Sequence, residues 1–197
     1  MFEASADDLT RREKARIIKT AVTPRPIAWV SSIDTEGNEN LAPYSSYNYA
    51  NLTRPVVMFN STLGPSGERK DTVNNAIETE EFAVNIVTSD LLNVMDTTSA
   101  NLDPAESEFS YADIESAPCA VIDAPRVAEA AVTLECALYD TMEIYDSIMV
   151  LGEVNHVQID PDVMSDGKID SRKLDTVGRL GGPYYTVSEP VEFERQF

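Results

Sequence analysis

The chain has 197 residues, 43% of them hydrophobic, so a single domain with a sizeable core is expected. Its 34 acidic and 15 basic residues give a net charge of −19, which repels phosphates and argues against nucleic acid and anionic membranes as partners. Only five of the basic residues are lysines, and this pattern favours a halophilic protein in which salt screens self-repulsion, over an ordinary acidic cytosolic one.

Residues 1–22 are predicted to form an N-terminal arm or short helix, because Leu9–Val22 carries spaced apolar residues among Arg, Lys and Glu. This segment lacks the apolar region of a signal peptide, and no stretch approaches the roughly 18 apolar residues of a membrane span. We therefore expect a cytoplasmic protein. Cys119 and Cys136 show no C-x-x-C spacing and are expected to be reduced thiols.

Three β-type runs follow, at Pro26–Ile33, Asn40–Tyr49 and Pro55–Asn60. The turn residues Thr35–Asn38 predict a hairpin between the first two runs. The middle run contains Pro43 among small hydroxyls and aromatic rings, and proline cannot donate to a strand ladder, so an edge strand or irregular strand end is expected. Such an edge offers backbone amides and hydroxyls beside aromatic rings, which suits a flat polar heterocycle.

The rest of the chain alternates predicted helices and strands within a single domain, 23–197. We expect a helix at Glu68–Glu80, a strand at Glu81–Val87, a short helix at Ser89–Thr97, a polar surface excursion at Asn101–Ala117, and strands at Ala131–Met142 and Ser147–Ile159 that pair as a hairpin. Many strands with few helices predict a closed antiparallel barrel.

The loop and helix start at Gly64–Thr72 carry a candidate phosphate site. The G-K-[ST] ending of a P-loop is missing, which excludes that motif. A Gly/Ser loop entering a helix still presents unpaired amides and the positive end of the helix dipole, and Arg69, Lys70 and Thr72 add two cations and a hydroxyl. Judged on this loop alone, a solvated helix start is the alternative interpretation.

Other motifs of catalysis are missing from the sequence. His156 is the single histidine and is expected at the surface; without nearby cysteines it cannot form a usual zinc site, and no G-x-S-x-G accompanies it. The sequence also contains no G-x-G-x-x-G motif, which argues against a Rossmann nucleotide site. Trp29 lies among apolar strand residues and is expected in the core.

An ordered set of segments resembles the flavin reductase-like, FMN-binding split-barrel family, in its flavoredoxin-type branch. These segments run from Thr23 to Tyr185 and read TPRPIAWVSSID, NLAPYSSYN, KDTVNNAIETEEFAVNIV, APRVAEAAVTLEC, GEV and RLGGPYY. The resemblance implies a mainly β protein with helical excursions, folded as an antiparallel split β-barrel. It also implies a homodimer with the flavin near the subunit interface.

The resemblance assigns site residues at the matching positions. For the FMN phosphate it implies the K-D-T motif and hydroxyls at the ends of neighbouring strands: Lys70, Asp71, Thr72, Ser31, Ser32, Ser61 and Thr62. The loop itself adds Arg69 to this group. For the flavin ring it implies Ala42, Pro43, Tyr44 and Ser45, to which Ser46 can add a hydroxyl, with Tyr184 and Tyr185 nearby. Tyr44 and Tyr47 depart from the Phe that many relatives carry, so the polarity above the flavin is expected to differ.

The expected function is that of an FMN-binding oxidoreductase. A nicotinamide donor, NADH or NADPH, would deliver hydride to flavin N5, and electrons would leave to free flavin, a ferric chelate or a partner protein. The sequence shows no acid–base constellation, which agrees with chemistry carried by the cofactor. A flavin-binding electron carrier without NAD(P)H activity and a cofactor-free barrel that acts as an interaction module are the alternatives.

Overall fold

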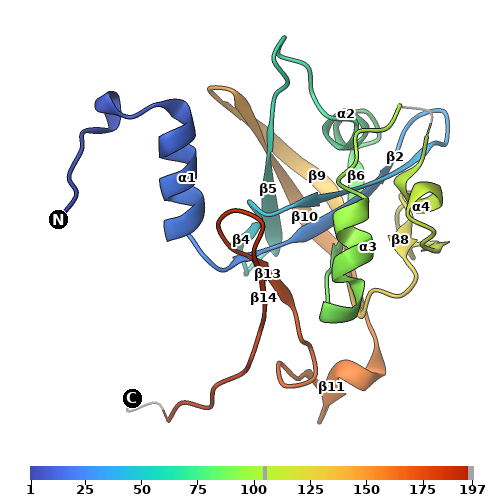
Figure 1. Ribbon diagram of the computed structural model, residues 1–197. Coiled ribbons are helices and arrows are strands. Elements are labelled where there is room, and N and C mark those ends of the chain that lie inside the picture. The colour runs from blue at the N-terminus through green and yellow to red at the C-terminus, as the bar shows by residue number, and fades with distance from the viewer. Residues whose placement is uncertain (104–105, 195–197) are drawn as a thin grey trace.

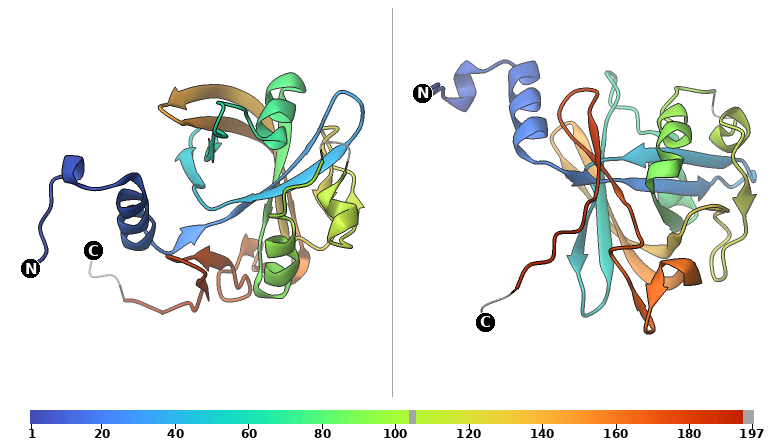
Figure 2. Two further views of the ribbon diagram at one scale, coloured as in Figure 1. Left: turned by 45° about the horizontal axis from the view of Figure 1, so that its top comes forward. Right: turned by 60° about the horizontal axis from the view of Figure 1, so that its bottom comes forward.

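The main sheet has seven antiparallel strands and curls into a barrel (Figures 1 and 2). The structure is a computed structural model that describes residues 1–103 and 106–194. The strand order is β3-β2-β6-β9-β10-β5-β4. The strands are β2 (Ala28–Ile33), β3 (Glu39–Tyr44), β4 (Asn48–Asn51), β5 (Val56–Thr62), β6 (Glu81–Ile86), β9 (Val132–Ile144) and β10 (Ser147–Ile159). The two outermost strands, β3 and β4, are consecutive in the chain, so the segment Ser45–Tyr47 forms the seam that joins the two ends of the sheet.

The interior of the barrel is a hydrophobic core closed at one end by helix α2 (Asp71–Glu78). Successive strand residues point to opposite faces, so Ala28 and Val30 of β2 face this core. From α2, Val73 and Ala76 pack onto the same core. The remaining buried members are Val57, Phe59, Phe82, Val84, Cys136, Ile148 and Val150.

A second core lies on the other face of β2, where Trp29 points, beneath helices α3 (Leu92–Thr97) and α4 (Glu108–Tyr111). The Trp29 indole donates a 2.9 Å hydrogen bond to the Thr98 hydroxyl, which confirms its predicted place in the core. Both faces of β2 are therefore buried. The smaller elements are η1 (Ala6–Asp8), β1 (Arg25–Pro26), η2 (Ser89–Leu91), β7 (Ser116–Ala117), β8 (Arg126–Val127), η3 (Pro161–Val163), β11 (Met164–Ser165), β12 (Lys168–Ile169), β13 (Val177–Arg179) and β14 (Tyr185–Val187).

Helix α1 (Arg11–Ala21) stands away from the barrel (Figure 2). It begins with a capping box, in which the Thr10 side chain accepts from the Glu13 amide and the Glu13 side chain accepts from the Thr10 amide. The predicted short N-terminal helix is confirmed, but none of its residues is buried. No helix in the described part of the chain has the length and apolar character needed to cross a bilayer.

The two predicted hairpins, β2 with β3 and β9 with β10, are confirmed, and two other elements differ from the prediction. The run Asn40–Tyr49 divides into β3 and β4 at the seam. The helix predicted from Glu68 starts at Asp71, because the chain first makes a turn in which the Gly64 amide donates to the Glu68 carbonyl, with Gly67 at a φ of +86°.

The expected surface position of His156 is wrong. An irregularity in the pairing of β10 with β9 lies between Val154 and His156, so His156 is half-buried opposite Glu135. The fully buried Glu135 carboxylate accepts hydrogen bonds from the amides of Ala120 and Val121. A β-bulge shifts the alternation of side chains, and the sequence pattern gave no sign of this one.

Candidate functional site

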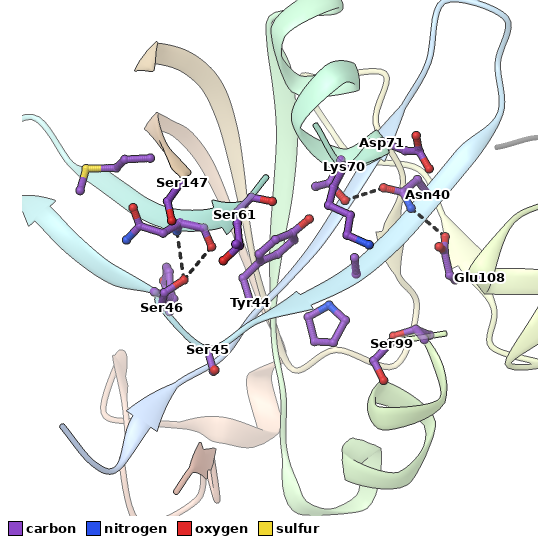
Figure 3. Close-up of a pocket in the computed structure, with 18 of the residues that line it drawn as sticks. Asn40, Tyr44, Ser45, Ser46, Ser61, Lys70, Asp71, Ser99, Glu108 and Ser147 are labelled. Atoms are coloured by element: carbon purple, nitrogen blue, oxygen red, sulfur yellow. Dashed lines mark hydrogen bonds between the residues drawn. The ribbon is translucent and has the colours of Figure 1, made fainter. Parts of the chain in front are cut away.

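A cavity of about 1330 Å³ opens along β3 and the seam (Figure 3). Strand β5, the start of α2 and the loop Thr98–Asp103 form its other walls. Among the strands that the structure describes, β3 pairs only with β2, so one edge of its backbone faces away from the sheet. The Leu41 amide lies on this free edge, because it donates to the Glu108 carboxylate at 2.9 Å. Pro43 comes two residues later on the same edge, where its missing N–H costs no ladder hydrogen bond.

One end of the cavity is built on a connected set of polar side chains. The Asn40 carbonyl oxygen accepts hydrogen bonds from Thr72 at 2.6 Å and from Ser32 at 3.3 Å. The Asn40 amide donates to Glu108 at 2.8 Å (Figure 3). The Asn75 amide donates to Ser32 at 3.2 Å. These bonds join β2, β3, α2 and α4, so the side chains at this end are held in place by four elements.

Tyr44 lies at the centre of the cavity with its ring against the barrel core. Its ring centroid is 4.6 Å from that of Phe59. Burial raises the pKa of Tyr44 to about 12, although hydrogen bonds with Thr72 and Ser61 act in the opposite direction. Burial also raises the pKa of Tyr47 to about 12. Both phenols therefore stay protonated and uncharged over the physiological pH range.

The seam is held by Ser46. Its hydroxyl donates to the Asn60 carbonyl at 2.8 Å and accepts from the Asn60 amide at 3.1 Å (Figure 3). A side chain thus replaces the backbone pairing that a continuous strand would have made with β5 at this point. The backbone of the seam is left free to line the cavity, as Ser45, Ser46 and Tyr47 do.

Lys70 brings a positive charge to the cavity. It is the residue that precedes α2, and no side chain in the described part of the chain caps this helix. Its ammonium group donates to the Asn101 side chain at 3.0 Å and points toward the space between Tyr44 and Asn40 (Figure 3). Uncapped first-turn amides and a nearby cation favour an anion, while Asp71 in the first turn opposes one.

Most of the predicted site residues line this one cavity. They are Ala42, Pro43, Tyr44, Ser45, Ser46, Ser61, Thr62, Lys70, Asp71 and Thr72. Three predicted residues of the phosphate group do not line it: Ser31, Ser32 and Arg69. Ser31 shares the parity of Trp29, faces the second core and donates to the Pro125 carbonyl at 2.5 Å. Ser32 contacts the cavity through two residues that line it, Asn40 and Asn75.

The remaining predicted residues also lie elsewhere. Arg69 points outward, with a guanidinium nitrogen 3.9 Å from the Glu143 carboxylate. Tyr184 is 67% exposed. Tyr185 does not line the main cavity; it lines a smaller one that adjoins it, beneath the guanidinium of Arg179. Tyr184 and Tyr185 were predicted from the resemblance and Arg69 from its loop, and none of the three lines the main cavity.

The cavity residues that the sequence analysis missed include Asn75, Asn101 and Glu108. Asn75 lies on the face of α2 next to Thr72 and could have been found from helical spacing. Glu108 falls in the stretch that was predicted to be a surface excursion, yet it is only 8% exposed. Nothing in the local pattern distinguishes this carboxylate from the chain's many exposed ones.

Comparisons with known proteins agree with this geometry. Residues 20–173 match the model of the flavin reductase like domain. Nitrilotriacetate monooxygenase component B from Bacillus cereus is 30% identical, with a TM-score of 0.93, over 99% of this chain and 98% of that one. The 2-nitrobenzoate 2-nitroreductase NbaA from Pseudomonas fluorescens is 29% identical, with a TM-score of 0.90, over 98% and 96% of the two chains. A protein with a split barrel domain from Shewanella frigidimarina NCIMB 400, 23% identical over the whole of both chains, has a TM-score of 0.85, and the predicted antiparallel split barrel is confirmed.

Proposed function

This chain belongs to the flavin reductase-like family, and from that premise we propose that it is an oxidoreductase that binds FMN in the cavity beside β3 and reduces it with a nicotinamide nucleotide. Electrons then pass to free flavin, a ferric chelate or a partner protein. One observation carries the proposal: the edge of β3, the half-buried Tyr44, the uncapped start of α2 and Lys70 all line one cavity.

The residues of the cavity fit a flavin nucleotide. Its volume of about 1330 Å³ is larger than the roughly 300–1,000 Å³ of most ligand pockets, so a nucleotide cofactor and a second reactant can share it. Backbone groups from Ala42 to Ser46 and the aromatic ring of Tyr44 suit a flat heterocycle with donors and acceptors on its rim. The start of α2 suits a phosphate monoester.

In this proposal the protein binds the flavin nucleotide and orients it. We assign the ring to the segment Ala42–Ser46, and the phosphate to Lys70, the first-turn amides of α2, and the hydroxyls of Ser61 and Thr62. Thr72 is 1% exposed and its hydroxyl already donates to Asn40, so its part is to hold Asn40 and the helix start in place. FMN, when bound, supplies the redox chemistry by taking hydride at N5.

No side chain of the cavity is needed as an acid or base in this proposal. Tyr44, the phenol nearest the proposed ring site, has a pKa raised to about 12 by burial, so it keeps its proton. The Glu108 carboxylate is occupied by two donors, Asn40 and Leu41. The protein's contribution is therefore positioning and local electrostatics.

We also propose a homodimer in which a second copy covers the flavin. The proposal rests on the family resemblance, and exposed apolar side chains support it. Ile17 and Ile18 on α1 are 45% and 60% exposed, and Ile18 lines the cavity. An amphipathic helix with no buried residue has an apolar face that a neighbouring subunit can cover.

The absorption spectrum of the purified protein tests the proposal first. Flavin bands that stay with the protein through gel filtration support it, and their absence after incubation with FMN favours a cofactor-free interaction module. An NADH and NADPH oxidation assay on the flavin-loaded protein follows. Oxidation with turnover supports a reductase, and tight flavin binding without any oxidation favours an electron carrier.

A further inference from the structure

A second cavity, of about 440 Å³, adjoins the first near the seam. The two cavities share Lys19, Arg25, Pro43, Ser45 and Ser99 in their walls. The charged residues of the second cavity are three cations and one carboxylate: Lys19, Arg25, Arg179 and Asp96. A chain with a net charge of −19 and only 15 basic residues thus gathers three of them around one small space.

Arg25 is fixed in this wall by neutral acceptors, and none of the ion pairs among residues 1–103 and 106–194 includes it. Its guanidinium donates to backbone carbonyls at the end of α1, those of Lys19 and Val22, the latter at 3.0 Å, and to the Leu180 carbonyl at 3.1 Å. Because these acceptors are neutral, they do not neutralise the positive charge of the guanidinium. Arg25 lies directly opposite Arg179 in the antiparallel pairing of β1 with β13. Burial lowers the pKa of Arg25, and the positive charge of Arg179 adds to this effect.

Arg179 is held by the turn at Gly182 and by Tyr185. It donates to the Gly182 carbonyl at 3.1 Å, and its guanidinium carbon is 4.2 Å from the centroid of the Tyr185 ring. The Asp96 carboxylate is 4.0 Å away and accepts a 2.8 Å hydrogen bond from the Tyr185 hydroxyl, so it neutralises Arg179 only in part. Lys19 has no carboxylate within 4.0 Å in the residues that the structure describes.

We propose that this second cavity is an anion subsite that takes a phosphate group of the nicotinamide nucleotide. The inference rests on the proposed function, because it places the second reactant beside the flavin. Pro43 and Ser45, which we assign to the flavin ring, also form the wall of this cavity. Lys70 lines only the larger cavity and Arg179 only the smaller one, so each proposed phosphate site has a cation of its own, while Lys19 and Arg25 line both cavities.

Charge and geometry favour a phosphate over other occupants. Arginine presents a planar set of donors that matches phosphate oxygens, and the two guanidinium groups approach the cavity from different segments, β1 and β13. A dianion placed between them relieves their mutual repulsion. The large negative charge of the remaining surface would repel the same ligand elsewhere, so this subsite also guides its approach.

Titration calorimetry of the flavin-free full chain with inorganic pyrophosphate at low salt tests the subsite directly. We expect saturable binding that weakens about tenfold to a hundredfold in Lys19→Gln and in Arg179→Gln, the range for one lost charge-assisted contact. Lys14→Gln removes the same charge from an exposed position on α1 outside both cavities and should leave binding unchanged. Absence of binding, or equal weakening in all three variants, overturns the proposal.

Kinetics on the flavin-loaded protein then identify the source of the phosphate. In Arg179→Gln, which changes a residue of the smaller cavity alone, we expect a higher KM for the nicotinamide nucleotide with an unchanged dissociation constant for FMN. A weaker FMN affinity with an unchanged KM would assign the subsite to the flavin's own phosphate and overturn the proposal. If the wild-type protein binds no flavin, the proposed function fails, while the pyrophosphate titration still decides whether the anion subsite exists.

Discussion

The Asn40 side chain donates a 2.8 Å hydrogen bond to the carboxylate of Glu108, a residue 68 positions later in the chain. The same carboxylate oxygen accepts from the Leu41 amide at 2.9 Å. Helix α4 thereby holds the beginning of β3, the strand that lines the cavity. Glu108 is 8% exposed and would be costly to bury without these two donors.

Replacing Glu108 should therefore destabilise the fold, and the loss should be smaller if the new side chain can still accept a hydrogen bond. Glu108→Ala leaves the Asn40 amide and the Leu41 amide without their partner, at a cost of about 1–3 kcal/mol for each buried orphan. Glu108→Gln keeps a carbonyl oxygen at the same position and should lose less. Urea unfolding of both variants measures the difference. Equal stability of the two would show that the hydrogen bonds contribute little.

Lys70→Ala tests the proposed phosphate site. The variant loses a charge-assisted contact worth roughly 1.5–3 kcal/mol, so FMN affinity should fall by about one to two decades while riboflavin affinity barely changes. Fluorescence titration with each flavin gives both constants. Arg69→Ala is the matched control, because Arg69 is the adjacent cation but points toward Glu143 outside the cavity. Equal losses for FMN and riboflavin would remove Lys70 from the phosphate site.

Glu135 should make stability depend on acid pH. Burial raises the pKa of its carboxyl, but hydrogen bonds from the Ala120 amide, Gln158 and the Val121 amide outweigh burial, so the pKa lies below its usual value of 4.5. A carboxyl with a lowered pKa in the folded state stabilises the protein above the unfolded-state value, and this contribution is lost as pH falls below about 4.5.

The measurement compares unfolding free energy at pH values from 7 to 3 in the wild type and in Glu135→Gln. The wild type should lose stability more steeply below about pH 4.5, because the variant has no proton to bind at this position. Glu78→Gln, which removes an exposed carboxylate on α2, should follow the wild-type slope. A Glu135→Gln profile parallel to the wild type would contradict the assignment.

The proposed homodimer is tested by light scattering of the flavin-loaded protein in high salt. We expect twice the mass of the chain, because a single barrel would leave the proposed flavin site open to solvent. Ile18→Asp places a charge on the exposed apolar face of α1 and should weaken association. Lys14→Asp changes a residue that is already charged on the same helix and serves as the control. A monomer with FMN fully bound would refute the dimer.

The net charge of −19 predicts that salt stabilises the fold. Salt shortens the screening length from about 30 Å at 0.01 M to about 3 Å at 1 M, which weakens repulsion between exposed carboxylates. The unfolding midpoint of the flavin-free protein should therefore rise with KCl up to about 1 M. Flavin-free protein is needed because salt also weakens phosphate binding, which shifts the midpoint through ligand linkage. A flat or falling midpoint would remove the proposed adaptation to high salt.

Local patterns in the sequence were enough to predict the long strands and two hairpins. Alternating apolar residues identified β9 and β10, and Pro43 correctly marked an edge strand, because each signal depends only on neighbours in the chain. The choice between Ser31 and Ser32 could not be made in this way. Both faces of β2 are buried, so the pattern shows no difference between the side toward the cavity and the side toward α3.

Contacts between distant segments were beyond local patterns altogether. The second cavity combines Lys19 from α1, Arg25 from β1 and Arg179 from β13, which meet only after the barrel has folded. Glu108 is similar, because its burial depends on β3 and not on its own neighbours. The resemblance to a known family predicted site residues within the matching motifs, but it could not predict the residues outside those motifs that contact them.

At the seam, we expect the local stability of the barrel to depend on whether a ligand is bound. The two ends of the sheet are joined through Ser45–Tyr47, and the pairing with β5 at this point relies on the Ser46 hydroxyl and the backbone of Asn60. Because the same three residues line the cavity, a ligand bound there would oppose local opening of β4 away from β5. Amide hydrogen exchange in these two strands should slow when flavin binds, whereas exchange within the β9–β10 hairpin should change little.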